Sequence, residues 1–201
     1  MALTALRLQG ITLRFQQLFL LTALLTTPDF ALAEEIRVAA ASNFRDALTE
    51  LGHQFEASTG NRVLLIFGST GKHYAQITHG APFDAFFAAD SELPALLEKD
   101  GLAVAGSRFT YARGQLVLFR PGRHDTPLDR AFLESRDFRY LAIANPELAP
   151  YGRAAQDVLE ALGLWESLQQ QLVRGENIGQ AYQFVVSGNA DAGFIARSQL
   201  A

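Results

Sequence analysis

Short apolar runs alternate with segments of helical periodicity along the first half of the chain. Residues 35–41 have an apolar core and are compatible with a strand. The apolar residues that follow are spaced three or four positions apart: Phe44, Ala47, Leu48, Leu51 and Phe55. This spacing predicts a helix from Asn43 whose apolar face points inward. Gly60 and Asn61 end this first strand–helix pair as a turn.

Two more strand–helix pairs are expected before Gly101. Five consecutive apolar residues, 63–67, indicate that a strand over 62–67 is buried on both faces. The other expected elements are a helix over 71–78, a strand over 83–89 and a helix over 92–99. Alternation of strands and helices is typical of a parallel sheet with right-handed crossovers, so the predicted fold class is α/β.

The pattern changes after Phe109. A long strand is expected over 111–119, and Pro121-Gly122 with a polar run up to Asp129 then interrupts the pattern. Beyond this break the expected elements are a strand over 141–144, helices over 154–162 and 178–186, and a strand over 192–196. The break between residues 110 and 125 therefore predicts a crossing between two α/β lobes.

The N-terminal segment predicts export. Arg7 and Arg14 precede an apolar stretch, 18–25, which is followed by Ala31-Leu32-Ala33. A basic start, a short apolar core and an A-x-A end are typical of a secretory signal peptide, here residues 1–33 with cleavage near Ala33. An uncleaved membrane anchor is the alternative, but the apolar core is too short to span a bilayer. The chain has no cysteine, so it has neither disulfides nor thiolate metal sites, and its composition suits a bacterial periplasm.

Composition and charge exclude several partners. The 201 residues are 49% hydrophobic and carry a formal net charge of −4, so the chain lacks the basic surface of a nucleic-acid-binding protein. The four histidines have no metal-ligand spacing and are expected at the surface or at helix ends: His53, His73, His79 and His124. Asp84 and Asp90 are expected to stiffen turns rather than to act as an acid–base pair.

Two strand-to-helix junctions carry the most informative chemistry. In Ala39–Phe44 and in Phe67–Lys72 an apolar run leads directly into small hydroxyl or amide residues. Such residues are often only helix caps, worth about 1 kcal/mol. Both junctions, however, follow predicted parallel strands, whose carboxyl ends form the ligand-binding edge of an open α/β sheet. Backbone N–H groups and neutral side-chain donors at that edge predict an anion site.

Two further junctions lie in the second lobe. Asn145–Gly152 holds two prolines that fix the position of Tyr151, and at Asn177-Ile178 a capping amide precedes a backbone N–H. An ordinary connection and an ordinary helix cap are the alternatives. A cage of uncharged donors suits a dianion that is never protonated at neutral pH, because a protonated phosphate needs an acceptor carboxylate. This favours sulfate, molybdate or tungstate without ranking them.

The chain resembles the periplasmic molybdate-binding protein family of ABC transporters (ModA). The matching stretches are AAASNF (39–44), FGSTGKHYAQITHGAPFDAFFAAD (67–90), GSRFTYARGQLVLF (106–119), IANPELAPYGRAA (143–155), ENIGQAY (176–182) and ADAGFIA (190–196). The resemblance implies a two-lobed type II periplasmic binding protein fold, with mostly parallel sheets, flanking helices and a ligand cleft between the lobes. It implies capture of molybdate and tungstate by hinge closure for delivery to an ABC transporter permease.

The resemblance also implies which residues hold the oxyanion. The implied ligands are Ser42, Asn43, Thr70, Tyr151 and, through its backbone, Ile178, with Ser69 and Gly71 in support. Some family members place a tyrosine after the last strand, but this chain has none in 193–197, so Tyr151 is expected to serve instead. The resemblance implies no cofactor, no direct metal-ion ligand, no catalytic residue, no nucleic-acid partner, no membrane insertion after signal cleavage, and a monomer.

The expected domains are the signal peptide at 1–33, lobe 1 at 34–112, lobe 2 at 113–196 and, at 197–201, the start of a crossing back to lobe 1. Family members complete lobe 1 after that crossing, so the chain ending at Ala201 is expected to be a fragment. A binding protein for sulfate or another small tetrahedral oxyanion is the alternative. An enzyme on the same scaffold is less favoured because no base accompanies Ser42 or Tyr151, and a regulator's sensing domain would not need a signal peptide.

Overall fold

The computed structural model describes residues 34–122 and 127–200. The expected signal peptide and His124 lie outside these ranges. The part of the chain from Glu34 onward is one compact unit that contains two sheets. Within the described residues, every helix is too short or too polar to cross a membrane.

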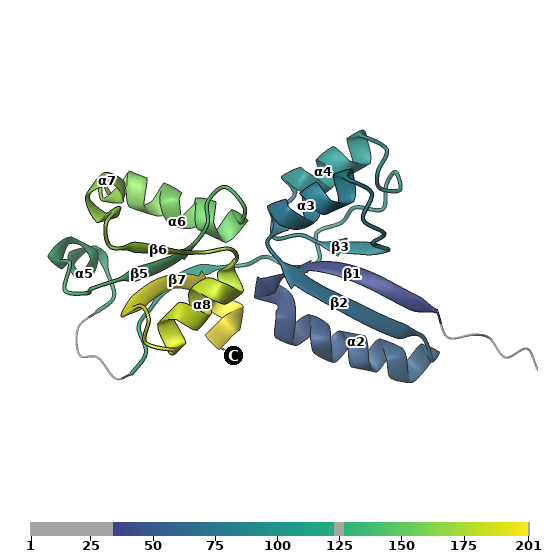
Figure 1. Cartoon of the computed structure of the whole chain (residues 1–201), viewed down its shortest axis with the longest axis horizontal. Coiled ribbons are helices and arrows are strands. Elements are labelled where there is room, and N and C mark those ends of the chain that lie inside the picture. The colour runs from purple at the N-terminus through teal and green to yellow at the C-terminus, as the bar shows by residue number, and fades with distance from the viewer. Residues whose placement is uncertain (1–33, 123–126, 201) are drawn as a thin grey trace, which may run out of the picture. The chain divides into compact units, whose positions relative to one another are not determined.

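The first sheet has three parallel strands in the order β2-β1-β3 (Figure 1). The strands are β1 (Glu35–Ala41), β2 (Arg62–Gly68) and β3 (Ala85–Phe87). The connecting helices are α2 (Arg45–Thr59), α3 (Thr70–Thr78) and α4 (Glu92–Lys99), and a 3₁₀ turn, η1 (Ser42–Phe44), leads into α2. Helix α2 lies on one face of this sheet, and α3 and α4 lie on the other. The predicted parallel arrangement is therefore confirmed.

The second sheet has four strands in the order β4-β7-β5-β6. Strand β5 pairs in parallel with β6 and β7, whereas β4 is antiparallel to β7. The strands are β4 (Leu116–Phe119), β5 (Leu141–Ala144), β6 (Leu172–Gly175) and β7 (Ala192–Ala196). The helices are α5 (Arg130–Ser135), α6 (Pro150–Ala161), α7 (Trp165–Leu168), α8 (Ile178–Val186) and the 3₁₀ turn η2 (Arg197–Leu200).

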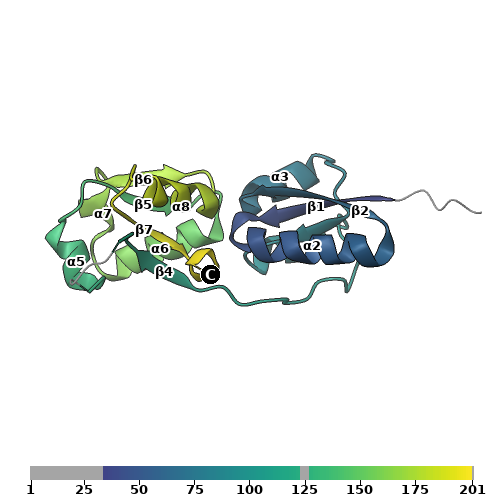
Figure 2. The ribbon, with the colours of Figure 1, turned by 90° about the horizontal axis from the view of Figure 1, so that it is seen from below.

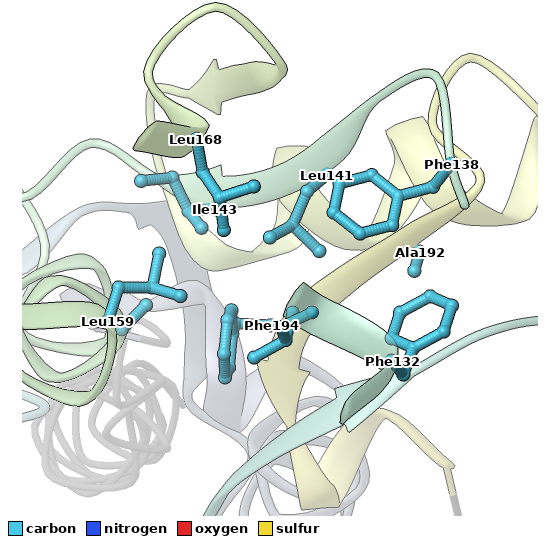
Figure 3. Packing of buried hydrophobic residues seen from close by; sticks show 10 residues of the cluster. Phe132, Phe138, Leu141, Ile143, Leu159, Leu168, Ala192 and Phe194 are labelled. Atoms are coloured by element: carbon cyan, nitrogen blue, oxygen red, sulfur yellow. The ribbon is translucent and has the colours of Figure 1, made fainter. Parts of the chain in front are cut away.

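Both faces of the second sheet are packed. On one face, Leu141 and Ile143 of β5 contact side chains from α5, α6 and α7, including Leu159 and Leu168 (Figure 3). On the other face, Ala142 and Ala144 pack against α8. Small alanines alternate with large aliphatic residues because α8 approaches this strand closely. Strand β5 is consequently buried along its whole length.

The first sheet is packed less completely than its sequence suggests. The expectation that 63–67 is buried on both faces is wrong: β2 is an edge strand, and Leu64 is 42% exposed. The expected inward face of α2 is also only partly correct. Leu48 and Gly52 are buried, but Leu51 and Phe55 are 50% and 41% exposed, because α2 packs mainly on β2 through a narrow stripe.

Most predicted elements lie within one residue of their expected limits, but the strand expected over 83–89 is shorter, since only Ala85–Phe87 pairs with β1. The expected long strand over 111–119 is wrong in its first half: 111–115 is extended without a strand partner, and only Leu116–Phe119 pairs (Figure 2). Helix α6 begins four residues earlier than expected, with Pro150 in its first turn, where proline's fixed φ is favourable. The short elements α5, α7 and β6 were not predicted.

Candidate functional site

A small hollow lies at the carboxyl ends of the strands, where four chain segments converge. It is lined by the β1–η1 junction, the β2–α3 junction and the starts of α6 and α8. Its polar lining residues are Ser42, Asn43, Ser69, Thr70, Tyr151 and Asn177. Ile178 also lines it, whereas Gly71 does not. The structure thus brings the five expected ligand residues to one place.

The first two segments lie side by side because of strand register. Strands β1 and β2 are parallel, and their last residues, Ala41 and Gly68, are partners. The next residues along each strand, Ser42 and Ser69, therefore leave the sheet at the same edge. Helix α3, which follows β2, is tied to the segment before α6, because the Gly71 amide donates a hydrogen bond to the Leu148 carbonyl at 2.9 Å.

Helix capping does not account for the hydroxyl and amide residues at these two junctions. None of η1, α2 and α3 is capped by a side-chain hydrogen bond at its start. The Ser42 hydroxyl instead donates to Asn177 Oδ1 and accepts from the Gly179 amide, both at 3.0 Å. Asn177 does cap its own helix, as the ordinary interpretation expected, by accepting from the Gln180 amide at 3.1 Å.

Two buried polar atoms within the described residues have no hydrogen-bond partner, and both belong to lining residues. They are Ser69 Oγ and Asn43 Oδ1. A buried polar group without a partner costs about 1–3 kcal/mol, so such groups normally mark a place where something else binds. Ser69 Oγ is a hydroxyl donor, and a half-turn of the Asn43 amide exchanges its oxygen for an N–H donor. The sequence had indicated only a supporting role for Ser69.

Thr70 and Tyr151 provide two further hydroxyls. Thr70 is buried, and its Oγ1 accepts from the Ala89 amide at 3.0 Å, so its own proton remains available as a donor. Tyr151 is in the first turn of α6, and burial raises the pKa of its hydroxyl. Because a tyrosine with a raised pKa stays protonated at neutral pH, this hydroxyl is an uncharged donor.

The lining residues carry no charge. An ion pair from Lys72 Nζ to Glu176 Oε1, at 2.6 Å, joins the first turn of α3 to the segment before α8, and each side chain is about half exposed. No cluster of three metal-ligating side chains occurs within 34–122 and 127–200. An arrangement of neutral donors without carboxylates is suited to an anion that brings no proton of its own.

The histidine and aspartate expectations have mixed outcomes. The expectation that His73 is at the surface or a helix end is wrong: it is buried, with Nε2 3.2 Å from the Ala40 carbonyl and Nδ1 3.0 Å from Gln76 Oε1. A neutral histidine donates from only one ring nitrogen, so both nitrogens are satisfied when Nε2 donates to the Ala40 carbonyl and the Gln76 amide turns its NH₂ group toward Nδ1. Asp90 fixes the turn before α4, as expected, by accepting from the Leu93 amide, whereas Asp84 accepts from the Arg37 amide of β1 and so ties the segment before β3 to the neighbouring strand.

Comparison with known proteins agrees with this geometry. The family described as bacterial extracellular solute-binding protein matches residues 36–201. The chain belongs to this family. Among curated relatives, the molybdate-binding protein ModA of Azotobacter vinelandii is 51% identical over 172 residues, which are 85% of this chain and 68% of that protein. ModA of Rhodobacter capsulatus is 45% identical over 85% of this chain and 67% of that protein.

Solved structures of solute-binding proteins share the fold. The periplasmic molybdate-binding protein of Azotobacter vinelandii superposes with a TM-score of 0.74 at 43% identity, over 80% of this chain and 71% of that one. The sulfate-binding protein SubI of Mycobacterium tuberculosis has a TM-score of 0.64 at 16% identity, over 81% and 64%, which is similarity of fold alone. The prediction of a periplasmic binding protein fold is confirmed.

Proposed function

We propose that this protein is a periplasmic solute-binding protein that captures molybdate and tungstate for an ABC importer. The observation that carries this proposal is the convergence of uncharged donors from four junctions on one hollow that contains two unpartnered buried polar atoms. The names of the two relatives described above point to the same ligand. A catalytic role has no comparable support, because no base lies beside the lining hydroxyls in any motif of the chain.

Each lining residue has a defined task in this proposal. The hydroxyls of Ser42, Ser69, Thr70 and Tyr151, the Asn43 amide and the Ile178 backbone N–H donate to the oxyanion, and Gly71 holds the second junction. Ser42 already accepts from Gly179, so on ligand binding its proton turns from Asn177 to the ion. Since donors come from both sheets' junctions, the ion favours the closed arrangement over an open one.

The uncharged lining also favours unprotonated dianions over anions that keep a proton at neutral pH. Molybdate, tungstate and sulfate are unprotonated dianions at neutral pH, whereas phosphate retains protons that need an acceptor carboxylate. None of the lining residues is a carboxylate. A hydrogen phosphate would therefore leave a proton facing other donors, at the cost of an unmade hydrogen bond.

The proposal extends to the organisation of the chain. Residues 1–33 are a signal peptide cleaved near Ala33, lobe 1 is 34–112, lobe 2 is 113–196, and 197–201 begin the crossing back. The exported protein works as a monomer in the periplasm and docks on a membrane permease. Uncharged donors are sufficient for this task, so no resident cofactor takes part.

A ligand panel tests the proposal directly. Molybdate and tungstate should raise the melting temperature of the protein without its signal peptide, because a ligand at a hundred times its Kd stabilises by about 2.7 kcal/mol. Phosphate should have no effect at the same concentration. A panel in which sulfate or chromate stabilises the protein more than molybdate would reassign the ligand, and one without any shift would refute the proposal.

Two substitutions test the site. Thr70→Ala and Tyr151→Phe should each weaken molybdate binding by about 1–3 kcal/mol, the cost of losing a hydrogen bond to a charged group. Isothermal calorimetry measures the loss. Thr78→Ala on the exposed end of the same helix and Tyr140→Phe at the surface are matched controls that should bind like the wild type. Unchanged affinity in both site variants would remove the assignment.

A further inference from the structure

The extended segment before β4 touches the site tyrosine at a glycine. A methyl group added to Gly114 would lie 2.0 Å from the Tyr151 hydroxyl oxygen and 2.9 Å from Tyr151 Cζ. Both distances are shorter than atoms that are not bonded to each other can approach. The tip of the tyrosine therefore occupies the space that any side chain at position 114 would need.

This glycine is required for space and not for backbone conformation. The glycines with positive φ are at other positions, among them Gly106 and Gly122 on either side of this segment. The backbone of Gly114 is one that other residues adopt without strain. The three atoms nearest to an added methyl group all belong to Tyr151, so a substitution at Gly114 acts first on this side chain.

The backbone around Gly114 is tied on both sides, which opposes its movement away from Tyr151. On one side the Tyr111 hydroxyl donates to the Ala88 carbonyl at 2.8 Å, and its ring packs 5.0 Å from that of Phe44. On the other side, the backbone N–H of Arg197 donates to the Gln115 carbonyl, and Arg197 Nη1 donates to Gln115 Oε1, each at 2.9 Å. The Tyr151 hydroxyl is the far end of a side chain, so it shifts more readily than the tied backbone.

We infer that Gly114 is a positioning residue that sets where the Tyr151 hydroxyl lies in the anion site. The inference rests on the proposed function, in which Tyr151 donates to the oxyanion. A side chain at position 114 pushes the tyrosine tip out of its place, while the donors at the β1–η1 and β2–α3 junctions keep theirs. The segment that connects the two sheets thereby controls one donor of the site.

A double-mutant cycle with Gly114→Ala and Tyr151→Phe tests this placement. Gly114→Ala should weaken molybdate binding about tenfold to a hundredfold, as expected for a lost hydrogen bond to a charged group. In the Tyr151→Phe background the same change should weaken binding far less, because the displaced hydroxyl is already absent. Gly52→Ala is the matched control: its methyl group meets Leu65 Cδ1 at an ordinary 3.6 Å, and it should bind like the wild type.

The same cycle without ligand separates this inference from the proposed function. Gly114→Ala should lower the melting temperature more in the wild-type background than in the Tyr151→Phe background. If the wild type binds no oxyanion, the proposed function fails. The ligand-free cycle still shows whether position 114 and the Tyr151 hydroxyl are in contact, because it measures the coupling between the two substitutions. Additive effects in the ligand-free cycle, or wild-type affinity in Gly114→Ala, would overturn the inference. If Gly114→Ala does not fold, recovery of folding in the double variant supports the inference, and failure of both variants overturns it.

Discussion

The two sheets are built from similar strand–helix pairs but differ in how far their strands are buried. In the second sheet, all four residues of β5 are inaccessible to solvent and β7 is buried throughout. In the first sheet, β2 has a comparable apolar sequence, yet most of it is only half-buried. The central strand β1 is buried from Val38 onward because it has a neighbour on each side.

Much of the difference follows from place in the sheet: β5 and β7 are inner strands, β2 is an edge strand, and the edge strands β4 and β6 of the second sheet are also only partly buried. Helices pack on both faces of β5, whereas α2 touches β2 through a narrow stripe and leaves Leu64 on the other face half in contact with water. Burial and packing of apolar side chains dominate stability, so the second sheet should contribute more to it. The site, by contrast, needs both sheets, because its lining residues follow strands of each.

The largest expected effect comes from removing one leucine from each sheet. Leu141→Ala in β5 should lower the free energy of unfolding by about 2–5 kcal/mol, since it leaves a cavity in a closed core. Leu64→Ala in β2 should cost about 1 kcal/mol or less, because this side chain already contacts water. Urea unfolding followed by circular dichroism measures both. Equal losses would mean that the first sheet is as well packed as the second.

Much of this fold could be predicted because its strands and helices follow from local patterns of apolar residues. The limits of β1, α4, β5, α8 and β7 agree with the predicted ranges, since each is an uninterrupted apolar run or a periodic segment with a clear end. Strand β6 could not be predicted: it has four residues, and Arg174 interrupts its apolar pattern. Helical periodicity predicted which face of α2 is apolar but not how far its residues are buried, because burial depends on which other segments pack there.

The meeting of the candidate residues at one place was predictable to a similar extent. The junction motifs indicated five residues that do meet at one hollow. The sequence could not indicate that Ser42 bonds to Asn177 across the site, because the two are separated by 135 positions. The requirement for glycine at position 114 was equally hidden, since it comes from a distant tyrosine and not from a turn.

A smaller effect is expected where a single amide connects the two sheets' junctions. Asn177→Ala removes the cap of α8 and the acceptor for the Ser42 hydroxyl, so it should lower the free energy of unfolding by about 1–2 kcal/mol. Asn189→Ala, at an exposed turn of the second half, is the control and should have little effect. Thermal and urea unfolding measure the difference. A loss no greater than that of the control would show that the connection adds nothing to stability.

The smallest effect is expected from the ion pair between Lys72 and Glu176. Its side chains are each about half exposed, and exposed pairs contribute less than about 1 kcal/mol. The pair Arg130–Glu134 is the matched comparison, because it is similarly short and exposed but lies within one helix of the second half. Both pairs should weaken with added salt.

Only the first joins groups on either side of the hollow, so Lys72→Ala should lower molybdate affinity by less than about tenfold, and Arg130→Ala should leave it unchanged. Equal effects of the two variants in calorimetry would mean that the link across the site is no different from an ordinary surface pair.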